Sequence, residues 1–167
     1  VEIDLLAQPG TELWEGGIES FYDLYQLRRL AAHLEQGNDI QPFLAEQSVE
    51  EEEVDDLLAD IWDEAVQTRF PHLIKHQGDA GGYYLPAEFA EPIWVDYGDE
   101  EEADGEFANE DNAVSFGSSY GLLRELTEIE QLFNQAGVPE IGARTALAVL
   151  RTAAQQSVDN GLPIILW

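Results

Sequence analysis

Negative charge is the feature that most constrains this chain. It carries 35 Asp and Glu residues against seven Lys and Arg, which gives a formal net charge of -28 at pH 7. Small soluble domains ordinarily carry a net charge with a magnitude of about 2 to 8. A surface this acidic repels nucleic acid phosphates and anionic lipid headgroups, and it attracts basic proteins or holds cations and water. We therefore expect no binding to nucleic acid or to membranes.

The apolar residues are numerous enough for a folded protein in spite of that charge. Hydrophobic residues make up 44% of the 167 residues, and four Trp, six Tyr and seven Phe are among them. Disordered acidic chains carry far fewer aromatic residues. No apolar run approaches the ~18 residues that span a bilayer. We predict one domain over residues 1–167, located in the cytoplasm, with N-terminal processing left open.

Helical periodicity marks four segments of the chain. Ser48 and Glu51 form a capping box at the start of the second, Gly137 closes the third, and Pro139 fits the first turn of the fourth. The predicted amphipathic helices cover residues 18–34, 48–68, 119–137 and 139–160.

Short strands account for most of the remaining apolar residues. We predict a strand or arm within residues 1–14, two strands within residues 78–96, and a buried strand at residues 162–167. The predicted fold class is α+β, with about four helices and a small sheet of three or four short strands. The alternative is a mainly α domain with a small β appendage.

The acids are concentrated in two segments. On a helix, Glu52, Asp56, Asp60 and Asp63 lie along one outer edge, where like charges repel. Residues 96–112 contain nine acids and no base, which is typical of an exposed loop. A basic partner would relieve the repulsion, so we predict partner binding at the helix edge. The alternative is a solvated face without a partner, as in proteins adapted to high salt.

Two histidines form a candidate metal site. His72 and His76 are four residues apart and Asp79 follows, so one turn of helix would direct both imidazoles and a carboxylate toward a divalent cation. The alternative is a structural role for the histidines. With zero Cys, the chain has neither disulfides nor thiol nucleophiles. We assign no catalytic residue, and we expect no cofactor apart from this candidate cation.

Aromatic residues between the two acidic segments are further candidates for binding. Tyr83 and Tyr84 lie in a stretch that has no base between Gln77 and Leu123. In such a setting, aromatic rings form protein-binding patches or cation cages. They equally fill the cores of small domains.

Two motifs resemble a family of small bacterial proteins without an established activity. The first runs from Phe70-Pro71-His72-Leu73 through His76 to Gly82-Tyr83-Tyr84-Leu85-Pro86. The second is Gly117-Ser118-Ser119 followed by Leu122-Leu123-Arg124-Glu125-Leu126. The resemblance covers residues 68–126, and it implies that the histidine region and the Gly117–Ser119 turn approach each other. It implies no reaction.

Three functional hypotheses follow from these patterns. The first is a non-catalytic acidic protein that covers a basic partner surface in the manner of an inhibitor or immunity protein, because complementary charge accelerates association. The second is a weak metal-dependent enzyme that uses His72, His76 and Asp79. The third is a housekeeping protein whose acidity is an adaptation to salt. The sequence favours the first, and it leaves the oligomeric state open.

Overall fold

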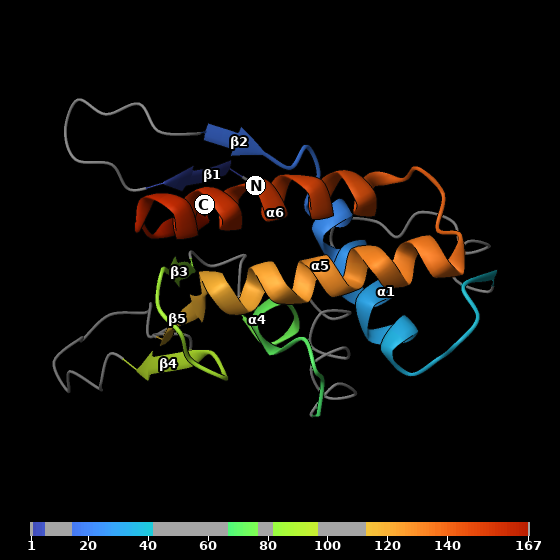
Figure 1. The fold of residues 1–167 in the computed structure, drawn as a ribbon, viewed down its shortest axis with the longest axis horizontal. Coiled ribbons are helices and arrows are strands. Elements are labelled where there is room, and N and C mark those ends of the chain that lie inside the picture. Colours follow the sequence, from blue (N-terminus) through green and yellow to red (C-terminus); the bar gives the residue numbers. More distant parts are fainter. Residues whose placement is uncertain (1, 6–14, 42–66, 77–81, 97–112, 167) are drawn as a thin grey trace, which may run out of the picture.

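The fold combines one mixed β-sheet with packed helices (Figure 1). The structure is a computed structural model that describes residues 2–5, 15–41, 67–76, 82–96 and 113–166. These ranges contain four helices and six strands. The prediction of an α+β fold is confirmed, although the sheet has more strands than the three or four that we expected.

Three long helices begin and end close to the predicted residues. Ser20 caps the first by accepting a hydrogen bond from the Tyr22 amide at 3.1 Å. Gly137 and Gly161 end the other two with φ of 68° and 66°, a left-handed conformation that favours glycine. The described helices are α1 (Phe21–Glu35), α4 (Pro71–Ile74), α5 (Ser119–Ala136) and α6 (Gly142–Asn160).

The structure corrects one helix boundary and leaves one helix untested. The N-cap of α6 is Ile141, so Pro139 lies before the helix instead of in its first turn. The helix predicted at residues 48–68 lies almost entirely outside the described residues.

The sheet has the strand order β2-β1-β6-β3-β5-β4. β3 and β5 are parallel, and the other described pairs are antiparallel. The predicted strands near the N-terminus, within residues 78–96 and at the C-terminus are all present; β2 and β5 were missed. The strands are β1 (Glu2–Leu5), β2 (Glu15–Gly17), β3 (Tyr83–Leu85), β4 (Ile93–Asp96), β5 (Ala113–Ser118) and β6 (Ile164–Leu166).

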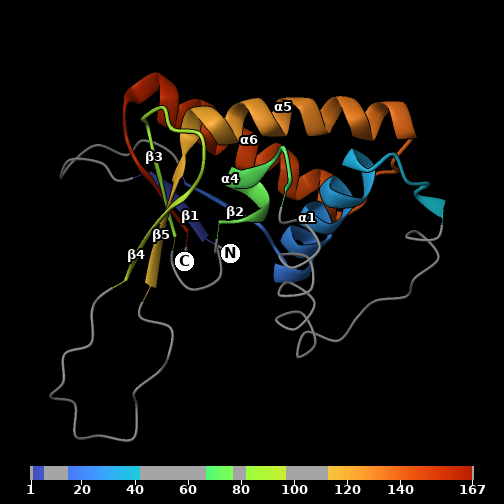
Figure 2. The ribbon, with the colours of Figure 1, turned by 90° about the horizontal axis from the view of Figure 1, so that it is seen from below.

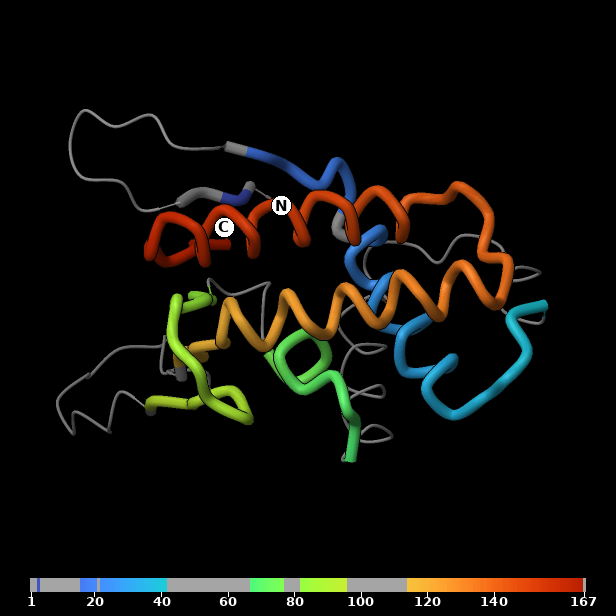
Figure 3. The backbone as a smooth tube through the Cα atoms, viewed as in Figure 1, coloured from blue at the N-terminus to red at the C-terminus, as the bar shows by residue number. Residues whose placement is uncertain are grey.

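The core lies where α1, α5 and α6 pack on one another and on the central strands. α5 and α6 lie side by side, and the tube in Figure 3 shows that they run in opposite directions. α4 packs against α5 and α1. The side chains of Leu122, Leu126, Ile129 and Phe133 on one face of α5 are fully buried in this core. No helix in the described part of the chain is long and apolar enough to cross a membrane.

β4 and β5 extend away from the helices (Figure 2). Their register pairs Ile93 with Phe116 and Asp96 with Ala113. Asp96, which we placed at the start of an exposed loop, is therefore the last residue of β4; residues 97–112 lie outside the described residues.

Candidate functional site

The two histidines of the candidate metal site lie under the surface, in and just after the short helix α4. His72 is 2% exposed and His76 is fully buried. Pro71 begins the helix, where its missing N–H costs no hydrogen bond. Asp79 lies outside the described residues.

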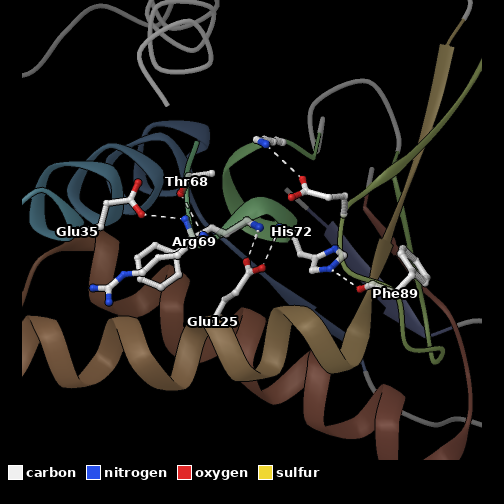
Figure 4. Close-up of polar contacts among 10 residues, drawn as sticks. Glu35, Thr68, Arg69, His72, Phe89 and Glu125 are labelled. Atoms are coloured by element: carbon white, nitrogen blue, oxygen red, sulfur yellow. Dashed lines mark hydrogen bonds and ion pairs between the residues drawn. The ribbon is translucent and has the colours of Figure 1, made fainter. Parts of the chain in front are cut away.

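His72 uses both ring nitrogens in hydrogen bonds to the backbone, and Figure 4 shows the one to Phe89. Nδ1 accepts from the Ser118 amide at 3.1 Å, and Nε2 lies 3.0 Å from the Phe89 carbonyl oxygen. An amide donor at Nδ1 assigns the proton to Nε2, which donates to the carbonyl. Burial lowers the pKa of His72. The ring is neutral and has no lone pair to offer a metal ion in this arrangement.

His76 is held by one hydrogen bond and by stacking. Its Nε2 lies 3.0 Å from the Tyr83 carbonyl oxygen, and its ring is stacked on Tyr84 with centroids 4.2 Å apart. Within the described structure, Nδ1 is buried without a hydrogen-bond partner. Burial lowers the pKa of His76 to about 3, so the ring is neutral near pH 7.

The side chains of Glu125 and Arg28 hold the ends of α4. The Glu125 carboxylate accepts hydrogen bonds from the amides of His72 at 3.0 Å and Leu73 at 2.8 Å (Figure 4). Arg28 donates to the carbonyl oxygens of Leu73 at 3.0 Å and His76 at 2.9 Å. Both side chains are almost fully buried. They satisfy backbone groups that so short a helix leaves unpaired.

Burial raises the pKa of Glu125 to about 8, while the two amide donors act in the opposite direction. The Tyr84 hydroxyl donates to the His72 carbonyl oxygen at 2.9 Å, and burial raises the pKa of this hydroxyl as well. The side chains of Arg28, His72, His76, Tyr84 and Glu125 thus form a buried polar cluster that is bonded to backbone groups, with only Nδ1 of His76 left without a partner in the described structure. Among the described residues, no three or more His, Cys, Asp or Glu side chains are grouped so that they could hold a metal ion. This geometry supports a structural role for the cluster.

The acidity of the protein is not balanced at its surface, because the bases are already engaged. All seven Lys and Arg residues lie in the described ranges. Four of them pair with carboxylates: Arg69–Glu128 and Arg124–Glu88 at 2.7 Å, Lys75–Glu91 at 3.2 Å, and Arg151–Glu130. Arg28 is buried, and Arg144 donates to the Val138 carbonyl oxygen at 2.9 Å.

The excess acids are concentrated elsewhere in the sequence. Twenty of the 35 acids and none of the bases fall outside the described ranges. The predicted partner-binding residues Glu52, Asp56, Asp60 and Asp63 are among these twenty.

The two tyrosines have separate environments. Tyr84 is 1% exposed and belongs to the core, which corrects its assignment to a partner-binding surface. Tyr83 is half-buried on the opposite face of β3, where its ring stacks on Phe116 with centroids 5.6 Å apart. Side chains alternate between the two faces of a strand, so Tyr83 and Tyr84 lie on opposite faces of the sheet, and Tyr84 is on the face that packs into the core.

Sequence reasoning missed Glu125 and Arg28. Both occur on amphipathic helices, at positions where the helical period places a buried residue. A charged residue at a buried position of such a pattern is the one signal that could have found them.

The lowered pKa of His76 predicts a loss of stability in mild acid. Stability from a depressed histidine pKa is full above its ordinary value of 6.5 and is lost as the pH falls toward 3. We expect the wild type to lose about 1 kcal/mol more than His76→Phe between pH 7.5 and 5.5, because the phenyl ring keeps the stacking but does not titrate. Urea unfolding of both proteins measures this difference. Parallel pH curves would contradict the assignment.

The structure and the charge distribution define an acidic α+β protein with a closed polar core and an excess of carboxylates. Residues 2–166 match the protein family described as "Putative DNA-mimic protein", and the chain therefore belongs to that family. A search of curated proteins and a search of solved structures each gave no match.

Proposed function

We propose that this protein binds the DNA-contacting surface of a basic protein and thereby keeps DNA off that surface. Membership of the DNA-mimic family over residues 2–166 is the observation that carries the proposal. The net charge of -28 and the engagement of the bases within the described fold support it. The role is that of a non-catalytic inhibitor.

The charge density of an acidic protein allows it to take the place of DNA on a basic protein surface. Duplex DNA carries about one negative charge per 1.7 Å of helix axis, and the proteins that bind it present Lys and Arg side chains to the phosphates. Carboxylates offer the same cations charge-assisted hydrogen bonds, often bidentate with Arg. Complementary charge also accelerates the encounter of the two proteins. The protein repels DNA, so it competes with DNA for the surface of the basic partner and does not bind DNA itself.

Competition with DNA tests this proposal. Immobilised protein is exposed to a cell lysate at low salt, and each captured protein is purified and tested again alone. We expect the captured proteins to be basic DNA-binding proteins that excess duplex DNA displaces. We also expect the logarithm of the dissociation constant to rise linearly with the logarithm of salt concentration. Capture that duplex DNA does not reverse, or a captured set without DNA-binding proteins, would contradict the proposal.

Variants that lack acidic groups test which part of the protein binds the basic partner in place of DNA. A variant that neutralises the predicted helix edge should bind a captured partner at least about tenfold more weakly at 0.1 M salt, with a smaller salt slope. A control that removes four charges from exposed positions in the described fold should bind within about threefold of the wild type. The test variant is Glu52→Gln, Asp56→Asn, Asp60→Asn and Asp63→Asn. The control is Glu19→Gln, Asp39→Asn, Glu140→Gln and Asp159→Asn. Equal losses in the two variants would assign binding to overall charge and reject the helix edge.

A further inference from the structure

β4 is an apolar strand at the edge of a very acidic protein. In the strand order β4 is last, and β5 is its neighbour among the described strands. The exposed fractions are 48% for Ile93, 41% for Trp94 and 41% for Val95. Within the described ranges, these three are the large hydrophobic side chains that remain exposed. Apolar exposure is therefore confined to one strand of the described fold.

The apolar surface of β4 continues inward across the sheet. The register pairs Phe116 with both Tyr83 and Ile93, so these three side chains lie on one face of adjacent strands. The next pair on the same face is Val95 with Val114. Tyr83, Phe116 and Val114 are half-buried, whereas Ile93 and Val95 are exposed. An apolar strip thus runs along this face and ends at β4, the last strand of the described sheet.

We propose that an extended basic segment of the protein partner lies along β4 and contacts Ile93 and Val95. This inference rests on the proposed function and names the surface that would supplement its electrostatics. An edge strand directs alternate N–H and C=O groups away from its neighbour, and a peptide can pair with them as an added strand. Apolar residues at every second position of the segment would meet Ile93 and Val95.

Charge decides between a basic segment and a second copy of the chain. Two copies that paired through β4 would bring together two proteins of charge -28, and acids stand at both ends of the strand, at Glu91 and Asp96. Acidic flanks and a preceding proline are features that oppose edge-to-edge association of identical chains. Glu91 is already paired with Lys75, so the attraction for a segment rich in Lys or Arg comes from the net charge of the whole protein. A basic occupant is therefore favoured over self-association.

The contact of the partner with Ile93 and Val95 would respond to salt concentration differently from the ionic contacts. Screening weakens the attraction between charges but leaves the burial of Ile93 and Val95 almost unaffected. Binding through charge alone would disappear at high salt, whereas binding through β4 would keep a preference for apolar partners.

Two synthetic peptides of equal charge test the proposal on the full chain. One has eight residues that alternate Lys and Val, and the other has eight that alternate Lys and Gly. Fluorescence anisotropy at about 0.05 M and 0.5 M salt measures both affinities, over a range in which screening changes strongly. We expect the wild type to prefer the Lys-Val peptide by about tenfold at both salt concentrations. A Lys-Val peptide that is N-methylated at every residue should lose this preference, because neither of its edges can then donate hydrogen bonds to a strand.

The double variant Ile93→Thr, Val95→Thr provides the matched control. Threonine keeps the β-branched shape that suits a strand but puts a hydroxyl in place of a methyl group of Val95 and of the ethyl group of Ile93. We expect this variant to bind both peptides as the wild type binds the Lys-Gly peptide. Equal affinity of the wild type for the two peptides, a preference that survives in the variant, or full binding of the N-methylated peptide would overturn the proposal.

Two further readouts separate this proposal from its alternatives. A dimer of the wild type in sedimentation that the double variant loses would identify a second copy as the occupant and overturn the proposal. DNA-displaceable capture of basic proteins with equal affinity by wild type and double variant would reject the β4 contact and leave the proposed function standing. The peptide preference without any DNA-displaceable capture would reject the proposed function and support the strand contact.

Discussion

Gly121→Ala is expected to destabilise the protein by about 2 kcal/mol or more. A methyl group at Gly121 would collide with the ring of His72. That ring is almost fully buried, and backbone groups fix both of its nitrogens, so it cannot turn aside. Alanine favours a helix over glycine by about 1 kcal/mol, which is too little to offset an overlap with a rigid neighbour.

Gly142→Ala is the matched control for this prediction. Gly142 is also in the first turn of a long helix, and a methyl group there would meet the carboxylate of Asp23. Asp23 is half-buried, and its carboxylate is at the end of a short side chain that can rotate toward solvent. We expect the control to stay within about 1 kcal/mol of the wild type. Urea unfolding of both variants checks the pair; if Gly121→Ala were as stable as Gly142→Ala, the described packing of His72 on α5 would be wrong.

The long helices were predictable because local sequence determines them. In α1, α5 and α6, apolar residues recur with the helical period, and a glycine with positive φ follows α5 and α6 directly. β6 was predictable for a similar reason: its local sequence is an uninterrupted apolar run, which is typical of a buried strand, and its three residues are all buried.

Strands β2 and β5 could not be predicted from their own sequences. β2 is Glu-Gly-Gly and has no apolar alternation; it is a strand because β1 pairs with it. β5 begins directly after an acidic segment and ends at the cap of α5, so its composition resembles a loop followed by a helix start. In both strands, tertiary pairing decides the conformation and intrinsic propensity does not.

The role of the histidines depends on residues far away in the chain. The spacing of His72 and His76 indicated a pair of ligands. However, the backbone groups that form hydrogen bonds with the His72 ring nitrogens belong to Phe89, 17 residues later, and Ser118, 46 residues later. Glu125, which anchors the amide of His72, lies 53 residues away. No local pattern encodes such pairings. The acidity, in contrast, is a property of composition, and the sequence alone led to the expectation of a basic partner.

Glu125→Ala is expected to destabilise the fold by about 3 kcal/mol. The substitution leaves the amides of His72 and Leu73 buried without an acceptor, and each unsatisfied group costs about 1 to 3 kcal/mol. Glu128→Ala, one turn further along α5, removes a carboxylate that is 46% exposed and paired with Arg69. Exposed ion pairs contribute at most about 1 kcal/mol, so this control should remain close to the wild type. Urea unfolding at neutral pH measures both.

The pH dependence of stability relative to Glu125→Gln tests the same contact in a second way. A carboxyl whose pKa is raised from 4.5 to about 8 contributes stability that is fully present below pH 4.5 and is lost as the pH rises through 8. The glutamine variant has nearly the same shape but does not titrate. The unfolding free energy of the wild type relative to Glu125→Gln should therefore decline steadily between pH 5 and pH 8. If it stayed flat instead, the two amide donors would outweigh burial, and Glu125 would be an ionised anchor of α4 throughout this range.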